Sequence, residues 1–181
     1  MFPSIVVFDL GKVLVDFDYC IAGRRIAAQS KMSAAEVQSF LDHSPLLVRF
    51  ETGQMNRQEF YETVRTHTGF DGTIGEFGSF FGGIFTPINP MVALHAKLRQ
   101  RGMPTYIFSN TNDLAIEDIS AKFPFYHNFD GYILSYKVGA MKPHATIYEA
   151  LEDISGRRGA EILYLDDRKE KVNLKIREAQ L

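Results

Sequence analysis

The sequence lacks the features that direct a protein into a membrane, an oxidising compartment or a nucleic-acid complex. Its single cysteine, Cys20, cannot form an internal disulfide, which favours a reducing compartment and predicts a cytoplasmic location. The net charge of −2 and the scattered lysines and arginines offer no basic surface, so we expect no nucleic-acid partner. No apolar run approaches the roughly 20 residues of a membrane span. The first run, residues 5–8, has no basic flank and ends at Asp9, so we expect neither a signal peptide nor a membrane partner.

Four short runs of β-branched and aromatic residues predict the strands of a parallel sheet. None of them alternates between apolar and polar residues, and runs that are apolar on both faces suit a parallel sheet covered by helices on both sides. At 181 residues and 45% hydrophobic content, the chain can bury one such core with a subdomain inserted. The runs are residues 5–8, 105–108, 132–134 and 162–165.

Helix start signals lie between the later strands, where the connections of a parallel sheet must run. An N-cap residue followed by proline or an acidic residue marks the first turn of a helix, and Gly102 marks a stop. Strands that alternate with helices predict a doubly wound α/β fold with a Rossmann-like parallel sheet. The start signals are Asn89-Pro90, Asn112-Asp113 and Pro143.

Residues 16–86 show helix starts but no convincing strand. We therefore expect a helical cap over residues 16–86, inserted into an α/β core formed by residues 1–15 and 87–181. The exit from the insert, residues 75–87, mixes aromatic residues with glycines, which is typical either of a packed helix of low propensity or of a hinge. Two capping boxes are predicted, one pairing Ser33 with Glu36 and one pairing Asn56 with Glu59.

Polar side chains follow each predicted strand. Ligands of open α/β sheets bind outside the carboxyl ends of the strands, so these side chains indicate a site. If the first and fourth strands are neighbours, their carboxylates converge, and a hard divalent cation relieves the repulsion, with Mg²⁺ favoured over Ca²⁺. A serine hydroxyl and a lysine at the same edge suit the oxygens of a phosphoryl group. The side chains are Asp9, Ser109, Ser135 and the pair Asp166-Asp167, with Lys142 after the third strand.

Four segments in order resemble the motifs of the haloacid dehalogenase-like hydrolase superfamily. They are FDLGKVLVD, YIFSNTND, GAMKPHATIYEAL and YLDDRKEKVN, with a helical cap inserted between the first and second. The cap segment FETGQMNRQEFYE is similar to the corresponding segment of the family branch that contains α-D-glucose-1-phosphate phosphatase. The resemblance covers nearly the whole chain and implies the α/β fold with a helical cap.

The resemblance also implies roles for the residues at the strand ends. Asp9 is implied to be a nucleophile that forms an aspartyl-phosphate, which water then hydrolyses. Mg²⁺ is implied to bind the carboxylates of Asp9 and Asp167 and the carbonyl of Gly11, with Asp166 in support. The implied phosphate-binding groups are Ser109, Lys142 and the backbone amide of Asn110.

Four features depart from the family pattern. Gly11 stands where most phosphatases of the superfamily have an aspartate as general acid, a group worth about 10²–10⁴-fold in rate, so we expect slowed rather than abolished catalysis. Lys12 is either a solvated loop lysine or an added cation that faces the phosphate.

Lys171 replaces a residue that commonly supports the metal site, and we expect weak Mg²⁺ affinity that Lys171→Asn tightens. The chain ends at KIREAQL where relatives continue for another strand, so we expect either a shortened chain or a sheet without that edge strand.

These observations predict a Mg²⁺-dependent phosphatase that acts on a small phosphorylated metabolite, a sugar phosphate, and is a monomer or a weak homodimer. One alternative is a 2-haloacid dehalogenase, in which the same aspartate displaces halide from carbon. That chemistry has no use for Mg²⁺, so the Asp166-Asp167 pair argues against it. The other alternative is a catalytically weakened binding or regulatory protein, suggested by Gly11 and Lys171.

Overall fold

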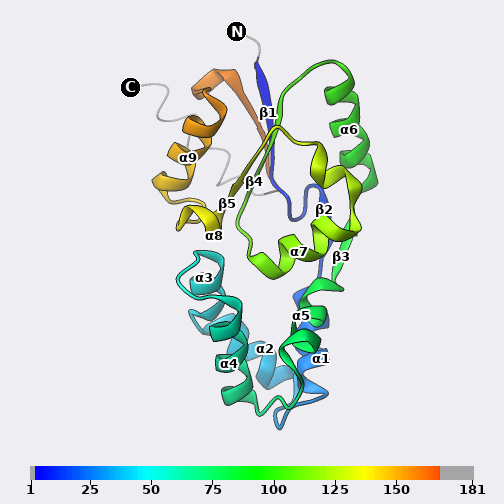
Figure 1. The fold of residues 1–181 in the computed structure, drawn as a ribbon, viewed down its shortest axis with the longest axis vertical. Helices are drawn as coiled ribbons and strands as arrows, with labels where there is room; N and C mark the ends of the chain where they lie inside the picture. Colours follow the sequence, from blue (N-terminus) through cyan, green and yellow to red (C-terminus); the bar gives the residue numbers. More distant parts are fainter. Residues whose placement is uncertain (1–2, 168–181) are drawn as a thin grey trace.

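The computed structural model describes residues 3–167, and a parallel sheet forms the core of this part of the chain (Figure 1). The strand order is β5-β4-β1-β6, which places β1 inside the sheet between β4 and β6. The four strands are β1 (Ile5–Phe8), β4 (Thr105–Ser109), β5 (Gly131–Leu134) and β6 (Ile162–Leu165).

Helices cover both faces of this sheet. Val6 and Phe8 of β1 point into one apolar cluster, to which α6 and α7 contribute, whereas Ile5 and Val7 point into the cluster under α9. This alternation follows from the two-residue period of a strand, and burial on both faces explains why β1 is apolar throughout. The surrounding elements are α6 (Asn89–Gln100), α7 (Asp113–Lys122), η1 (Pro124–Asn128), α8 (Ser135–Val138), α9 (Ala145–Ser155) and η2 (Gly159–Glu161).

The sheet confirms the predicted doubly wound α/β fold. All four predicted strands are present, with β4 extended to Ser109 and β5 beginning at Gly131. Asn112 caps α7 as predicted, since its side-chain oxygen accepts a hydrogen bond from the backbone N–H of Ala115 at 3.0 Å. The start of α6 differs slightly, because Ile88 rather than Asn89 is its N-cap residue.

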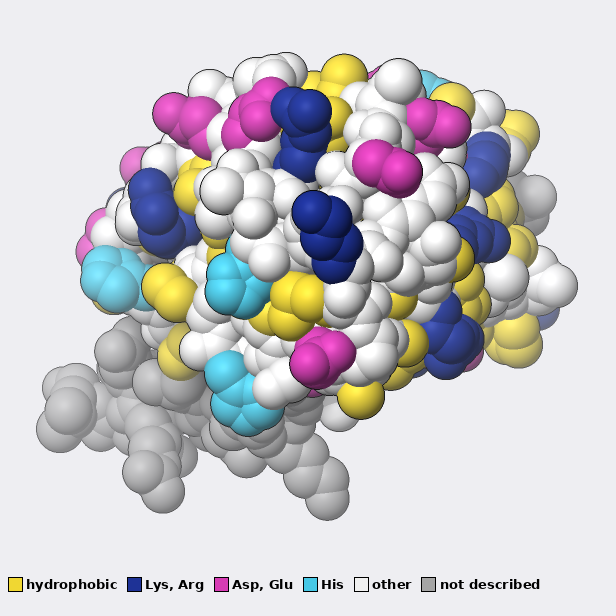
Figure 2. Space-filling view, turned by 90° about the horizontal axis from the view of Figure 1, so that it is seen from below, with side chains coloured by type: hydrophobic (Ala, Val, Ile, Leu, Met, Phe, Trp, Pro, Cys, Tyr) yellow, Lys and Arg dark blue, Asp and Glu magenta, His cyan; other side chains and the backbone are white. Residues whose placement is uncertain are grey.

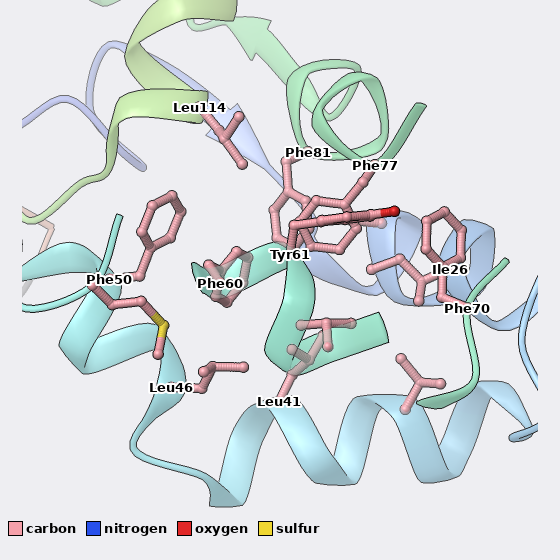
Figure 3. Close-up of a cluster of buried hydrophobic side chains, with 14 of the residues drawn as sticks. Ile26, Leu41, Leu46, Phe50, Phe60, Tyr61, Phe70, Phe77, Phe81 and Leu114 are labelled. Atoms are coloured by element: carbon pink, nitrogen blue, oxygen red, sulfur yellow. The ribbon is translucent and has the colours of Figure 1, made fainter. Parts of the chain in front are cut away.

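Five helices lie between β2 and β3 and pack around their own aromatic core (Figure 3). Both predicted capping boxes are present at the starts of α2 and α4. The rings of Phe50 and Phe60 stack with centroids 4.4 Å apart, and Phe77 and Phe81 of α5 pack against the same cluster, which makes α5 a packed helix. The helices are α1 (Tyr19–Ala27), α2 (Ala34–His43), α3 (Leu46–Glu51), α4 (Arg57–Thr68) and α5 (Ile74–Gly82).

A two-stranded antiparallel sheet joins this helical group to the core. It pairs β2 (Val15–Phe17) with β3 (Phe85–Pro87), so the expectation that residues 16–86 contain no strand is wrong at both ends of the segment. Three-residue strands are too short to show a period in the sequence. The expected boundaries after residues 15 and 86 fall inside this ribbon and stay a prediction.

The surface seen from the helical group carries charges of both signs (Figure 2). Lysine and arginine side chains are interspersed there with aspartate and glutamate side chains, so this face shows no continuous basic patch. Within residues 3–167, no helix has both the length and the apolar character that a membrane crossing requires. The expectations for Lys171 and for the end of the chain concern residues outside the described part.

Candidate active site

Asp9 lies directly after β1, at the carboxyl edge of the sheet that faces the helical group (Figure 1). The parallel pairing of β1 with β6 places Phe8 opposite Leu165, and the backbone N–H of Asp9 donates to the carbonyl of Leu165 at 2.8 Å. The Asp9 side chain is almost fully buried, and its Oδ1 accepts a hydrogen bond of 2.7 Å from the backbone N–H of Leu10. The strand and this local bond therefore fix the direction of the carboxylate.

Three carboxylates meet at this edge, as the sequence predicted for neighbouring first and fourth strands. Asp9, Asp166 and Asp167 each offer one oxygen, and these oxygens all lie within 4.8 Å of one another. Converging carboxylates are the donor set that a hard divalent cation prefers. The residues present therefore fit a Mg²⁺ ion. Asp167 also lines the cavity described below, whereas the side chain of Asp166 has no exposed surface.

Lys142 is buried behind the carboxylates. Its Nζ lies 2.9 Å from Oδ2 of Asp9 and 3.1 Å from Oδ2 of Asp166, and it donates to the carbonyl of Phe108 at 3.0 Å. It also donates to the hydroxyl of Tyr164 at 2.7 Å. Its side chain has no exposed surface, so the ammonium neutralises the two aspartates from inside the protein.

The side chain of Asn110 holds the backbone of Lys142 in place. Its Nδ2 donates to the Lys142 carbonyl at 3.1 Å, and its Oδ1 accepts from the Lys142 N–H at 2.7 Å. The neighbouring Ser135 ties two loops together, because its Oγ accepts from the N–H of Thr111 and donates to the carbonyl of the same residue. Ser135 is fully buried and is not among the residues that line the cavity.

A cavity of about 300 Å³ opens between the sheet edge and the helical group. Its floor includes Asp9, Ser109 and the loop after β4, and Ser109 Oγ donates to the carbonyl of Asn110 at 3.3 Å. Residues of the β2-β3 ribbon and of the helices α1, α3 and α7 contribute to the other walls. The wall residues include Phe17, Tyr19, Glu51 and Phe85.

Lys12 lies at the cavity with its ammonium already paired. Its Nζ lies 2.5 Å from Oδ1 of Asp16 and donates to the carbonyl of Phe17 at 2.7 Å, and the same atom lies 4.8 Å from the centre of the Phe17 ring. The backbone of Lys12 has a φ of 61°, a left-handed conformation that is uncommon for a residue with a side chain. The side chain of Lys12 therefore links the loop after β1 to the strand β2.

The ring of Phe17 occupies the space beside Gly11. A Cβ atom placed on Gly11 would lie 2.7 Å from Cε1 of Phe17, which is closer than such atoms approach. Phe17 is held by Tyr19 and Phe85, whose ring centres lie 5.0 and 6.0 Å from its own. An aspartate side chain at position 11 would therefore displace this ring.

No pattern in the sequence predicted that Tyr164, Tyr19 or Glu51 belongs to the site. The sequence favours a packing role for Tyr164, but its hydroxyl donates to Oδ2 of Asp166. Burial raises the pKa of Tyr19, the nearby Glu51 carboxylate raises it further, and the side chain of Asn112 lowers it. Tyr19 therefore stays protonated and can act as a hydrogen-bond donor. The strand period could have revealed Tyr164, because residues two apart on a strand point to the same side.

The helical group contacts the core at several places, including the packing of α5 against α7. Arg57 of α4 forms an ion pair with Asp113 of α7, with Nε 2.7 Å from Oδ2, and a second ion pair with Glu117. Gly53 lies against α8, since a Cβ on this glycine would lie 2.3 Å from the carbonyl oxygen of Tyr136. The left-handed φ of 67° and the close approach both require glycine at this position.

Comparisons with known proteins place the chain among its relatives. The chain is 25% identical over 171 residues to the D-ribitol-5-phosphate phosphatase of Bacteroides thetaiotaomicron, covering 90% of this chain and 82% of that protein. Its fold is similar to that of a HAD family enzyme from the same organism, solved in complex with magnesium and inorganic phosphate. The TM-score is 0.83 at 22% identity, and the match covers 97% of this chain and 90% of that one.

A second solved structure has a similar fold. A HAD-like family hydrolase from Porphyromonas gingivalis matches with a TM-score of 0.82 at 24% identity, covering 98% of this chain and 88% of that chain. The family model described as haloacid dehalogenase-like hydrolase matches residues 3–171, which is most of the sequence. The chain therefore belongs to the haloacid dehalogenase-like hydrolase family.

Proposed function

We propose that the protein is a Mg²⁺-dependent phosphatase that hydrolyses a small sugar phosphate through an aspartyl-phosphate on Asp9. The observation that carries the proposal is the position of Asp9, whose carboxylate contacts the buried Lys142 and lies within 4.8 Å of two further carboxylates at the floor of a cavity. The relative named as a D-ribitol-5-phosphate phosphatase supports the same chemistry.

In the proposed reaction, an oxygen of Asp9 attacks phosphorus and the bond from phosphorus to the sugar oxygen breaks. The sugar leaves with that oxygen, which takes a proton from water to become a hydroxyl group, and a second water molecule then hydrolyses the aspartyl-phosphate to release phosphate and regenerate Asp9. Lys142 sets a positive charge beside the carboxylate of Asp9 and holds its Oδ2 by a charge-assisted contact. Asp9 is aimed by the strand and by the N–H of Leu10, so little reorientation is needed before attack.

Mg²⁺ would be held by Asp9, Asp167 and the carbonyl of Gly11, with Asp166 in support. When bound, the ion supplies positive charge that neutralises the phosphoryl oxygens. Ser109, which lines the cavity, would donate a hydrogen bond from its hydroxyl to one phosphoryl oxygen, and the backbone N–H of Asn110 would donate a hydrogen bond to a second phosphoryl oxygen. Lys12 would add a cation at the cavity, although Asp16 already neutralises part of its charge.

The walls of the cavity favour a hydroxylated organic group. Glu51 offers a hydrogen-bond acceptor, Tyr19 offers a donor, and the rings of Phe17 and Phe85 supply apolar surface. A neutral polyol or sugar presents hydroxyl groups to the first pair and carbon faces to the second. Gly11 further favours a sugar 1-phosphate, because an anomeric hydroxyl is a better leaving group than an ordinary alcohol and depends least on a general acid.

The alternatives have less support. A 2-haloacid dehalogenase has no need for the metal-binding donor set formed by Asp9, Asp166 and Asp167. A protein without catalytic activity would not need to aim Asp9 into a cavity and pair it with a buried lysine. We further infer that residues 16–86 act as the cap that selects the substrate.

The proposal is tested by hydrolysis of p-nitrophenyl phosphate and of a panel of sugar phosphates, with Mg²⁺ and with a chelator. We expect activity that needs Mg²⁺ and disappears in Asp9→Asn, a variant of nearly the same shape. Inactivity of the folded protein across several divalent metals would support a binding role instead. Chloride release from haloacetate without metal would support the dehalogenase, and preference for glucose 6-phosphate over glucose 1-phosphate would contradict the role given to Gly11.

A further inference from the structure

The hydroxyl of Tyr164 lies between the two charged groups behind Asp9. Tyr164 and Asp166 are two residues apart at the end of β6, so their side chains point to the same side. The hydroxyl accepts a hydrogen bond of 2.7 Å from Nζ of Lys142 and donates one to Oδ2 of Asp166. The ring packs against Phe108, with centroids 5.3 Å apart, and holds the hydroxyl in this position.

Around Lys142, oxygen atoms outnumber the N–H donors of the ammonium group, and the Tyr164 hydroxyl is the one oxygen among them that can also donate a hydrogen bond. An ammonium group has three N–H donors. Four oxygens surround Nζ at 2.7 to 3.1 Å, from Phe108, Tyr164, Asp9 and Asp166. The Tyr164 hydroxyl donates a hydrogen bond to Asp166, so Asp166 depends less on hydrogen bonds from Lys142. The ammonium group of Lys142 can therefore keep its contact with Asp9.

We propose that Tyr164 is a positioning residue: its hydroxyl sets the ammonium of Lys142 against Asp9 and holds Asp166 on the buried side of the carboxylate cluster. Tyr164 acts through these two residues and does not itself touch the substrate. The inference builds on the proposed function and goes beyond it, because it assigns the site a residue outside the implied catalytic and metal-binding set. Groups that orient metal ligands from behind are worth about 10–100-fold in affinity or activity.

The two hydrogen bonds of the hydroxyl explain why this role needs tyrosine rather than phenylalanine. Either ring would fill the space beside Phe108, because both rings are apolar and similar in size. Only tyrosine can accept a bond from Lys142 and donate one to Asp166 at the same time. Tyr164→Phe therefore removes the positioning group and keeps the packing.

The matched control is Tyr132→Phe. Tyr132 lies on β5, and its half-buried hydroxyl donates to the backbone carbonyl of Tyr126 at 2.5 Å, so this substitution also removes one hydrogen-bonded hydroxyl. Four quantities are measured for the wild type and both variants: the melting temperature without metal, kcat and KM for p-nitrophenyl phosphate with Mg²⁺, and the Mg²⁺ dissociation constant by calorimetry. The Mg²⁺ titration starts from metal-free protein and requires no activity.

We expect Tyr164→Phe to lower kcat by about 10–100-fold, to change KM less than about 3-fold and to weaken Mg²⁺ binding at least several-fold. Tyr132→Phe should leave kcat, KM and the Mg²⁺ dissociation constant within about 2-fold of wild type. The inference is overturned if Tyr164→Phe leaves Mg²⁺ binding or kcat unchanged, or if both variants lower kcat in proportion to their loss of melting temperature. If the wild type is inactive, the proposed function fails, and the Mg²⁺ titration alone decides the role of Tyr164.

Discussion

Lys142 Nζ lies 2.9 Å from Oδ2 of Asp9, and the lysine side chain is completely enclosed. In a buried ion pair, the attraction between the two charges offsets much of the free energy needed to remove them from water. Removal of one partner leaves an uncompensated charge in a poorly solvated place, which typically costs about 3–5 kcal/mol. The pair therefore makes the stability of the fold depend on the site.

Lys142→Met tests this dependence. We expect the variant to lose about 3–5 kcal/mol of unfolding free energy at neutral pH, since Asp9 and Asp166 then repel each other without a counter-charge. Lys97→Met on the exposed surface of α6 is the control and should change stability by less than about 0.5 kcal/mol. Urea unfolding monitored by circular dichroism measures both. Equal stability of the two variants would show that the buried pair contributes nothing.

Gly11→Asp tests the contact with Phe17. We expect this variant to lose about 1–3 kcal/mol of stability, because the new side chain enters the space of the Phe17 ring. The double variant with Phe17→Leu should recover much of the loss, whereas Phe17→Leu alone should not stabilise the protein. Thermal unfolding of the three variants gives the coupling between the two positions. Additive effects would mean that the ring and position 11 do not interact.

Glu51→Gln tests how the cavity recognises the organic part of the substrate. We expect KM for the best sugar phosphate to rise about 5–10-fold, in line with the roughly 1–1.5 kcal/mol that separates charged from neutral hydrogen bonds. KM for p-nitrophenyl phosphate, which has no hydroxyl groups on the ring, should change little. Glu62→Gln on the exposed face of α4 is the control for the change in net charge. A parallel rise in KM for both substrates would contradict a role of Glu51 in sugar recognition.

Asp130→Asn tests a pH-dependent contribution to stability away from the active site. Burial tends to raise the pKa of Asp130, but the N–H of Thr105 and the guanidinium of Arg99 outweigh it and lower the pKa below its usual value. A carboxyl group with a lowered folded pKa stabilises the protein above its unfolded pKa, and this contribution disappears as the pH falls through the folded pKa. We expect Asp130→Asn to cost about 1 kcal/mol at pH 7 and progressively less below about pH 4. Urea unfolding at a series of pH values measures the difference, and a constant difference down to about pH 2 would contradict the assignment.

The positions of the strands, and of the polar residues that follow them, could be predicted because both depend on short local segments of the sequence. The apolar runs before Asp9 and Asp166 predicted buried strands; the structure shows both strands, but only β1 is buried, whereas the edge strand β6 is partly exposed. The adjacency of the two strands was stated only as a condition, because a single sequence does not fix the order of strands in a sheet. The same limit applied to the pairing of β2 with β3.

Side-chain directions were the part that the sequence could not provide. Phe17 beside Gly11 and Glu51 at the cavity depend on how the helical group sits over the sheet, which is a tertiary feature. Lys12 had two interpretations, and its pairing with Asp16 and with the Phe17 carbonyl matches neither of them fully. Its assignment to phosphate binding stays a prediction.

Both passages of the chain between the core and the helical group run through one ribbon, β2 paired with β3. The helical group also packs on the core away from this ribbon: Leu114 of α7 lies in its aromatic core, Arg57 pairs with Asp113 and Glu117, and Gly53 lies against Tyr136. These contacts would have to part together before the helical group could move away from the sheet. Anchorage at several places therefore keeps the upper walls of the cavity in register with its floor.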